Sequence, residues 1–181
     1  MNRRWAWGAA IAVVFGLSAA GIWLAGMRRV SDVPETRHSQ AVTDTFETYV
    51  NARFAYSVCY PRELLFPQGE AVNGDGQRFV SKDGLARVVV FGSNNVLEQT
   101  LQQIFDQDSK DFDGRPVSVS DRSIGGDSFT FSGDSGGDIV FEKTYLRNDR
   151  TKTLDIVYPK TAGAAYAALV RRMAECFRSA D

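Results

Sequence analysis

The pattern of hydrophobic and polar residues divides the chain into an apolar N-terminal run and a longer part with mixed patterns. Residues 5–27 contain no charged side chain. From residue 45 onward, apolar and polar residues either alternate or recur at helical spacing. Alternation predicts half-buried strands, and helical spacing predicts amphipathic helices. We therefore expect one membrane-type segment followed by one folded domain.

The alternating stretches predict a series of β-hairpins. Phe54, Tyr56, Val58 and Tyr60 alternate with small or polar residues, and Pro61 ends this run. Residues 62–66 are expected to form only a connector. The same alternation predicts further strands at about residues 45–50, 77–81, 85–91, 116–120, 128–132, 138–146 and 151–158.

Two amphipathic helices are predicted, at about residues 96–108 and 162–178. Asn95 is expected to cap the first, and Glu98 stands three residues later, as in a capping box. The apolar stripes are Leu97, Leu101, Ile104 and Phe105 in the first helix, and Tyr166, Leu169, Val170, Met173, Cys176 and Phe177 in the second. This order predicts an α+β fold with a mainly antiparallel β-sheet packed with two amphipathic helices, preceded by one N-terminal transmembrane helix.

The apolar run has the length of a membrane span. A helix over residues 5–27 reaches roughly 34 Å, enough for the hydrocarbon core of a bilayer. All three tryptophans of the chain, Trp5, Trp7 and Trp23, lie near its two ends, as in an aromatic belt. We expect residues 1–29 to be a membrane anchor, residues 30–44 a polar linker, and residues 45–181 the globular domain.

A cleaved signal peptide is the alternative interpretation of this segment. Arg3 and Arg4 would be its charged region, residues 9–17 its apolar core, and residues 18–20 a small-residue cleavage site. The apolar run continues beyond that site to Met27, which favours retention. We expect a single-pass protein of the bacterial inner membrane, attached through residues 5–27, with its domain facing the periplasm.

The charge of the soluble part argues against a nucleic-acid partner. After Met27 the chain has 19 basic and 22 acidic residues, a net charge of −3. These charges alternate in sign along the chain, which is typical of a solvated surface. No basic stripe is present that would neutralise phosphates.

The stretch from Phe54 to Pro61, with its strand ending in an aromatic residue and proline, is followed by further hairpins and a closing amphipathic helix. This arrangement resembles the PsbP/Mog1-like domains, and the chain is similar to small exported proteobacterial proteins of unknown function. The resemblance covers residues 45–178. It implies an α/β/α-like sandwich and work in binding or assembly rather than catalysis, and it assigns no functional residue.

Residues 133–137 spell Gly-Asp-Ser-Gly-Gly, which resembles the segment around the nucleophilic serine of trypsin-like proteases. A serine needs a base within hydrogen-bond reach, and the only histidine of the chain, His38, lies in the predicted linker. The residues after the motif predict a strand, not the helix that follows a hydrolase elbow. We interpret residues 132–138 as a turn between two strands, expect no enzyme, and keep a serine hydrolase using Ser135 only as a remote alternative.

Cys59 and Cys176 are the two cysteines, a number that fits one disulfide in an exported protein. The bond requires the last helix to pack on the strand face that carries Cys59, opposite the large aromatic residues. Two buried free thiols are the alternative. A catalytic cysteine is not expected, because no histidine is available to activate it.

No cofactor or metal site is expected. The aspartates at 106, 108, 111 and 113 crowd one region, but a calcium loop needs a glycine at its sixth position and a closing glutamate, which are missing. One histidine and two separated cysteines do not suit zinc, and no nucleotide-binding fingerprint is present.

These observations predict a membrane-anchored envelope domain that acts as a non-catalytic protein-interaction or assembly module. The envelope protein partner is not identified by any motif. The alternative is a periplasmic small-ligand-binding domain with its site in a cleft between sheet and helix. The first hypothesis expects an apolar surface patch, and the second expects a cavity.

Overall fold

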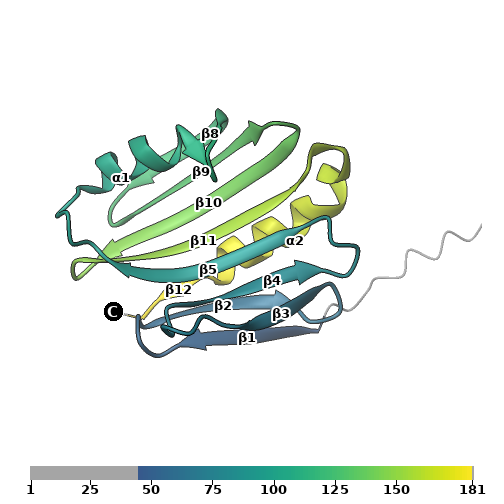
Figure 1. The fold of residues 1–181 in the computed structure, drawn as a ribbon, viewed down its shortest axis with the longest axis horizontal. Helices are drawn as coiled ribbons and strands as arrows, with labels where there is room; N and C mark the ends of the chain where they lie inside the picture. The colour runs from purple at the N-terminus through teal and green to yellow at the C-terminus, as the bar shows by residue number, and fades with distance from the viewer. Residues whose placement is uncertain (1–44, 181) are drawn as a thin grey trace, which may run out of the picture. The chain divides into compact units, whose positions relative to one another are not determined.

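The computed structural model describes residues 45–180, which form a β-rich domain with two α-helices (Figure 1). The predicted anchor, the linker and His38 lie outside the described residues. In the part that the structure describes, no helix is long and apolar enough to cross a membrane.

A seven-stranded antiparallel sheet forms the centre of the domain (Figure 1). Its strands, in spatial order, are β3 (Leu65–Glu70), β4 (Gly76–Ser81), β5 (Arg87–Asn94), β11 (Arg150–Pro159), β10 (Asp138–Arg147), β9 (Ser128–Ser135) and β8 (Ser118–Gly125). A smaller sheet contains β1 (Phe46–Asn51), β2 (Tyr56–Pro61) and β12 (Arg178–Ser179), and a short hairpin contains β6 (Asp111–Phe112) and β7 (Arg115–Pro116). The helices are α1 (Leu101–Asp108) and α2 (Gly163–Cys176), the latter after a 3-10 turn, η1 (Lys160–Ala162).

The central sheet carries a separate hydrophobic core on each face. On β11, Leu154 and Ile156 point to one face and Val157 to the other, as the alternation of a strand requires. The first face packs against α2 and β2, and the second packs against α1 through Ile104 and Phe105. The α+β prediction with a mainly antiparallel sheet and two helices is confirmed.

The predicted start of the first helix is wrong. The helix begins at Leu101, not near Val96, and Thr100 rather than Asn95 caps it. Thr100 and Gln103 form the capping box: the Thr100 hydroxyl accepts from the Gln103 N–H, and the Gln103 side chain accepts from the Thr100 N–H. Leu97, which was predicted to belong to the apolar stripe, lies before the helix and is 75% exposed.

Three of the strand predictions also need correction. Residues 62–66 were expected to be a connector, but Leu65 begins edge strand β3, whose other five residues are exposed and show no alternation. Strand β2 begins at Tyr56 rather than Phe54, because Ala55 has a φ of +54° and ends a turn. The Phe54 ring instead covers Gly92 so closely that a Cβ atom at that glycine would lie 2.2 Å from the ring.

Strand β8 covers residues 118–125, so it extends well past the predicted 116–120.

Candidate functional site

The Gly-Asp-Ser-Gly-Gly segment does not present a nucleophile. Gly133 to Ser135 end strand β9, and Gly136 and Gly137, both with positive φ, form the turn into β10. The Ser135 side chain is completely buried, and its Oγ has no hydrogen-bond partner among the described residues. The connection is a two-residue turn, tighter than the predicted 132–138 segment. Because Ser135 points into the protein, it cannot reach a substrate from this position.

Cys59 and Cys176 are joined by a disulfide that links β2 to the last residue of α2. Cys59 Sγ lies 3.8 Å from the carbonyl oxygen of Arg172, so this strand face contacts the C-terminal turns of the helix. The aromatic side chains of Tyr56 and Tyr60 lie in the core between the sheets. The bond therefore has a structural role, because it holds the end of α2 to strand β2.

The four aspartates near the end of α1 do not converge on one point. Asp106 accepts a hydrogen bond from Gln102, Asp111 accepts from the N–H of Gly114, and Asp113 forms an ion pair with Arg87. Only Asp108 turns inward. No group of side chains that could hold a metal ion is found among residues 45–180.

A cluster of three carboxyl groups, one buried and two half-buried, lies beneath α1, and no motif in the sequence predicted it. Glu142 on β10 and Asp155 on β11 are direct cross-strand neighbours, and Asp108 from α1 hydrogen-bonds to Glu142. Glu142 is only 3% exposed and accepts a 2.8 Å hydrogen bond from the Thr144 hydroxyl. The available signal was the alternation of β10 and β11, which places Glu142 and Asp155 on a core-facing side.

Burial raises the pKa of each of these carboxyls. Desolvation is the main cause for Glu142, and the charges of Asp155 and Asp108 add to it. Desolvation also raises the pKa of Asp155, with contributions from the charges of Asp108 and Asp113, and it raises the pKa of Asp108. An Asp108–Glu142 hydrogen bond needs one of the two groups to carry a proton. The cluster therefore favours protonated carboxyls.

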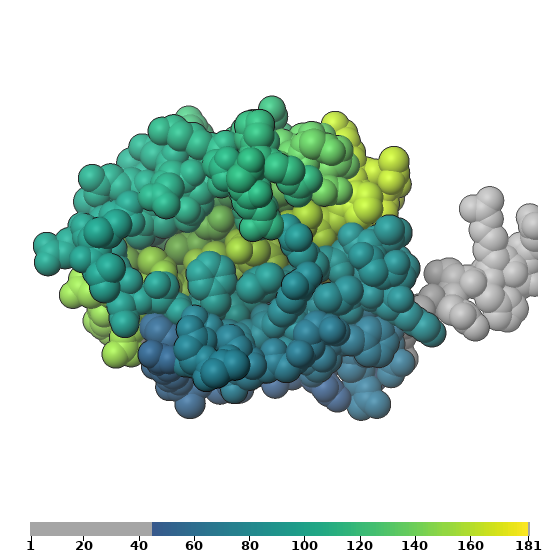
Figure 2. All heavy atoms as spheres, viewed as in Figure 1, coloured from purple at the N-terminus to yellow at the C-terminus, as the bar shows by residue number. Residues whose placement is uncertain are grey.

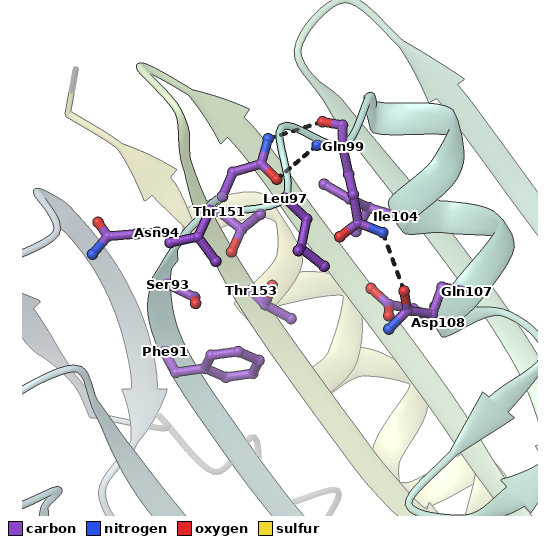
Figure 3. A pocket seen from close by; sticks show the side chains of 12 residues that line it. Phe91, Ser93, Asn94, Leu97, Gln99, Ile104, Gln107, Asp108, Thr151 and Thr153 are labelled. Carbon is purple, nitrogen blue, oxygen red and sulfur yellow. Dashed lines mark hydrogen bonds between the residues drawn. The ribbon is translucent and has the colours of Figure 1, made fainter.

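Next to this cluster is a polar cleft of about 360 Å³, here called the α1 cleft (Figure 3). It lies between the sheet and the segment made of α1 and the preceding loop, and Figure 2 shows a hollow on this face between the regions of α1 and of β4 and β5. Asn95 binds the backbone of Gln99, and the Gln99 amide donates to Gln107 at 3.2 Å, which ties the loop to the helix (Figure 3). The side chains that line the cleft include Phe91, Ser93, Asn94, Leu97, Gln107, Asp108, Thr151 and Thr153.

An apolar groove of about 470 Å³, here called the α2 groove, opens at the other side of the sheet. Ala162 and Ala165 line the α2 side of the groove, and their small side chains leave it open. Leu64, which also lines the groove, is 42% exposed. The Tyr166 hydroxyl donates to Asp83 at 3.2 Å and holds the β4–β5 turn against the helix. The complete lining is Leu64, Ser81, Lys82, Asp83, Ala162, Ala165, Tyr166 and Leu169.

Hydrogen bonds fix the polar rim of the α2 groove. The pKa of Asp83 is held below its ordinary value, mainly by the hydrogen bond from Ser81 and then by that from the N–H of Leu85. Leu85, in the same turn, is 54% exposed. The groove thus combines a fixed rim with apolar surface that is open to solvent.

No family model matches this chain, and no curated protein matches it in sequence. Solved structures that share its fold include the following two. The solution structure of cyanobacterial PsbP (CyanoP) from Synechocystis sp. PCC 6803 has 13% identity and a TM-score of 0.55, with 81% of this chain and 99% of that chain covered. The Ran-binding protein Mog1p from Saccharomyces cerevisiae has 12% identity and a TM-score of 0.51, with 77% and 97% covered. These likenesses confirm the predicted PsbP/Mog1-like fold.

Proposed function

We propose that this PsbP/Mog1-like domain is a non-catalytic protein-interaction or assembly module, held at the periplasmic face of the bacterial inner membrane by residues 5–27. Mog1p, which has a similar fold, is a Ran-binding protein. That likeness supports protein binding as the general role. The buried position of Ser135 argues against the remote hydrolase alternative.

The α2 groove is the observation that carries the proposal. Water-exposed apolar surface next to Leu64 and Leu85 is unfavourable unless another molecule covers it. The small side chains of Ala162 and Ala165 leave space for a large apolar side chain of a partner. Burying one such side chain contributes about 1.5–3 kcal/mol, so a Leu or aromatic residue of a partner would be a suitable anchor here.

In-cell cross-linking of the tagged full-length protein, followed by mass spectrometry, tests this proposal. We expect one dominant partner, absent from a control that carries only residues 1–43. Ala165→Glu places a charge in the groove at an exposed helix position and should abolish the cross-link. Ala168→Glu is the matched control, because it is exposed on the same helix and does not line the groove.

Two outcomes would count against the proposal. If no captured protein reaches an amount close to that of the tagged full-length chain, the interaction role loses its basis. If Ala165→Glu and Ala168→Glu both retain the partner, the α2 groove is not the contact surface.

Small-ligand binding in the α1 cleft is a second candidate function. The polar side chains that converge there, including Thr151, Gln107 and Asp108, give this alternative a specific observation (Figure 3). A mixed polar and apolar cleft with a few fixed donors is typical of small-molecule sites. A thermal-shift screen of polar metabolites should then find a compound whose stabilisation is lost in Thr151→Val. A screen without any such compound would remove this candidate.

A further inference from the structure

Strand β8 forms one edge of the seven-stranded sheet (Figure 1). All eight of its residues are exposed, and it pairs only with β9. The opposite edge strand, β3, carries Pro67 and an irregular register between Pro67 and Glu70, which are common protections against strand addition. Strand β8 has no proline; its register shifts between Val119 and Asp121, and it is regular from Asp121 to Gly125, the stretch that is open to an added strand.

The turn between β8 and β9 determines which backbone groups face outward. Gly126 and Asp127 form a two-residue turn that Gly125 and Ser128 close. In such a hairpin the closing pair exchanges hydrogen bonds, and hydrogen-bonded and non-hydrogen-bonded pairs then alternate along the ladder. The N–H and C=O groups of Ile124 and Arg122 therefore point away from β9. They are free to pair with an added strand.

The side chains on this edge carry two adjacent opposite charges. Asp121 and Arg122 form no ion pair with any residue in the described range 45–180. A shallow depression of about 360 Å³, lined by Val119, Ser120, Asp121 and Arg122, accompanies the edge. Both charges are therefore available to side chains of an incoming segment.

A second copy of β8 cannot satisfy these charges. In an antiparallel pair, directly opposite residues point to the same face, whereas Asp121 and Arg122 are consecutive and point to opposite faces. A two-fold axis at Asp121 places Asp121 opposite its own copy, and an axis at Arg122 places Arg122 opposite its own copy, so that like charges face each other. An axis at Ser123 places Arg122 opposite Ile124 and Asp121 opposite Gly125, which leaves both charges without a partner. Charge complementarity therefore excludes a second copy of β8 and favours a segment with a different sequence.

We infer that β8 accepts an extended segment of a different protein as an additional antiparallel strand, with an acidic residue opposite Arg122 and a basic residue opposite Asp121. In the antiparallel direction the segment reads acidic and then basic from its N-terminus. This rests on the proposed interaction function and adds a second contact surface to it. Main-chain hydrogen bonds would supply the contact, and the charges would select the partner.

Synthetic peptides test this inference on the full-length protein in detergent. The probe is a short, blocked, alternating Thr/Val peptide with a central Glu-Lys pair, and the comparison peptide has Lys-Glu in its place. Fluorescence anisotropy should show that Glu-Lys binds about fivefold more tightly, since each cross-strand charge pair is worth up to about 1 kcal/mol. The double exchange D121K/R122E should reverse this preference.

A proline substitution tests the backbone pairing separately. Ile124→Pro removes an N–H that points away from β9 and should abolish binding of both peptides, with an unchanged circular dichroism spectrum. Ile124→Val, which keeps the N–H, is the matched control and should bind as the native chain does.

Failure to bind either peptide, equal binding of both, or a preference for Lys-Glu would overturn the inference, and so would undiminished binding by a folded Ile124→Pro variant. These results are independent of the cross-linking experiment. A captured partner together with absent peptide binding would overturn the role of β8 alone.

Discussion

At the scale of single residues, the carboxyl cluster of Asp108, Glu142 and Asp155 is the least expected feature of the domain. Ionised carboxylates are costly in an apolar interior. The Oδ1 atom of Asp155 is buried and has no hydrogen-bond partner among the described residues. The interaction between Asp108 and Glu142 connects the end of α1 to the sheet. The cluster is stable only while its groups stay largely neutral.

The free energy of unfolding should therefore fall as the pH rises. The folded-state pKa values of Glu142 and Asp155 lie well above the ordinary values of 4.5 and 3.8. Above those ordinary values the unfolded chain releases protons that the folded chain keeps, so stability is complete at lower pH and is lost as the pH approaches the raised pKa values. Urea titrations at a series of pH values between mildly acidic and mildly alkaline measure this slope.

A glutamine substitution distinguishes this cluster from other titrating groups. Glu142→Gln keeps a side chain that can hydrogen-bond to Asp108 but cannot ionise, so the variant should show a shallower decrease with pH. Asp106→Asn, at an exposed position of the same helix, is the matched control. An identical slope in the native chain and in Glu142→Gln would refute the assignment.

Ser135 offers a second prediction at this scale. Its buried hydroxyl has no partner among the described residues, so Ser135→Ala should leave the stability unchanged or raise it by about 0.5–1 kcal/mol. Chemical denaturation measures the change. A hydrolase that used Ser135 would instead lose all turnover, so any esterase or peptidase activity that disappears in Ser135→Ala would contradict our interpretation.

At the scale of elements, α1 shows how a local signal can be duplicated. The chain contains two candidate capping patterns, Asn95 with Glu98 and Thr100 with Gln103. The structure uses the second, and the Asn95 side chain instead closes a loop through hydrogen bonds with the backbone of Gln99. Glu98 has a φ of +50°, in the left-handed region. A right-handed helix cannot include a residue in that conformation, so the helix begins after residue 98.

The cap gives a prediction for this element. Thr100→Ala removes the hydroxyl that accepts from the Gln103 N–H and should lower the free energy of unfolding by about 1 kcal/mol. Thr100→Ser keeps the hydroxyl and should remain close to the native value. Equal stability of the two variants in urea denaturation would show that Thr100 is not the functional cap.

At the scale of the whole domain, the disulfide joins parts of the chain that are far apart in sequence. Cys59 and Cys176 are 117 residues apart, and the bond fixes β2 to the end of α2. Closing a loop of this length restricts the unfolded chain by about 4–5 kcal/mol in the chain-entropy description. It also keeps the last helix on the sheet, where Met173 and Phe177 are fully buried.

Reduction should therefore destabilise the domain by up to about 4–5 kcal/mol. The measurement is urea denaturation with and without a thiol reductant, with the Cys59→Ala/Cys176→Ala variant as a control that should not respond to the reductant. An unchanged midpoint for the native chain on reduction would contradict a stabilising role for this bond.

The amino-acid sequence by itself determined most strands, the second helix and the α+β class, because alternation and helical spacing depend on residues only two to four positions apart. It also indicated that Gly136 and Gly137 belong to a turn. It misplaced the start of α1, where two equal capping signals compete. Tertiary structure alone decided the Cys59–Cys176 pairing, the approach of Asp108 to Glu142 and Asp155, and both clefts. Each of these depends on the packing of distant segments, where burial and electrostatics act between residues that have no local pattern in common.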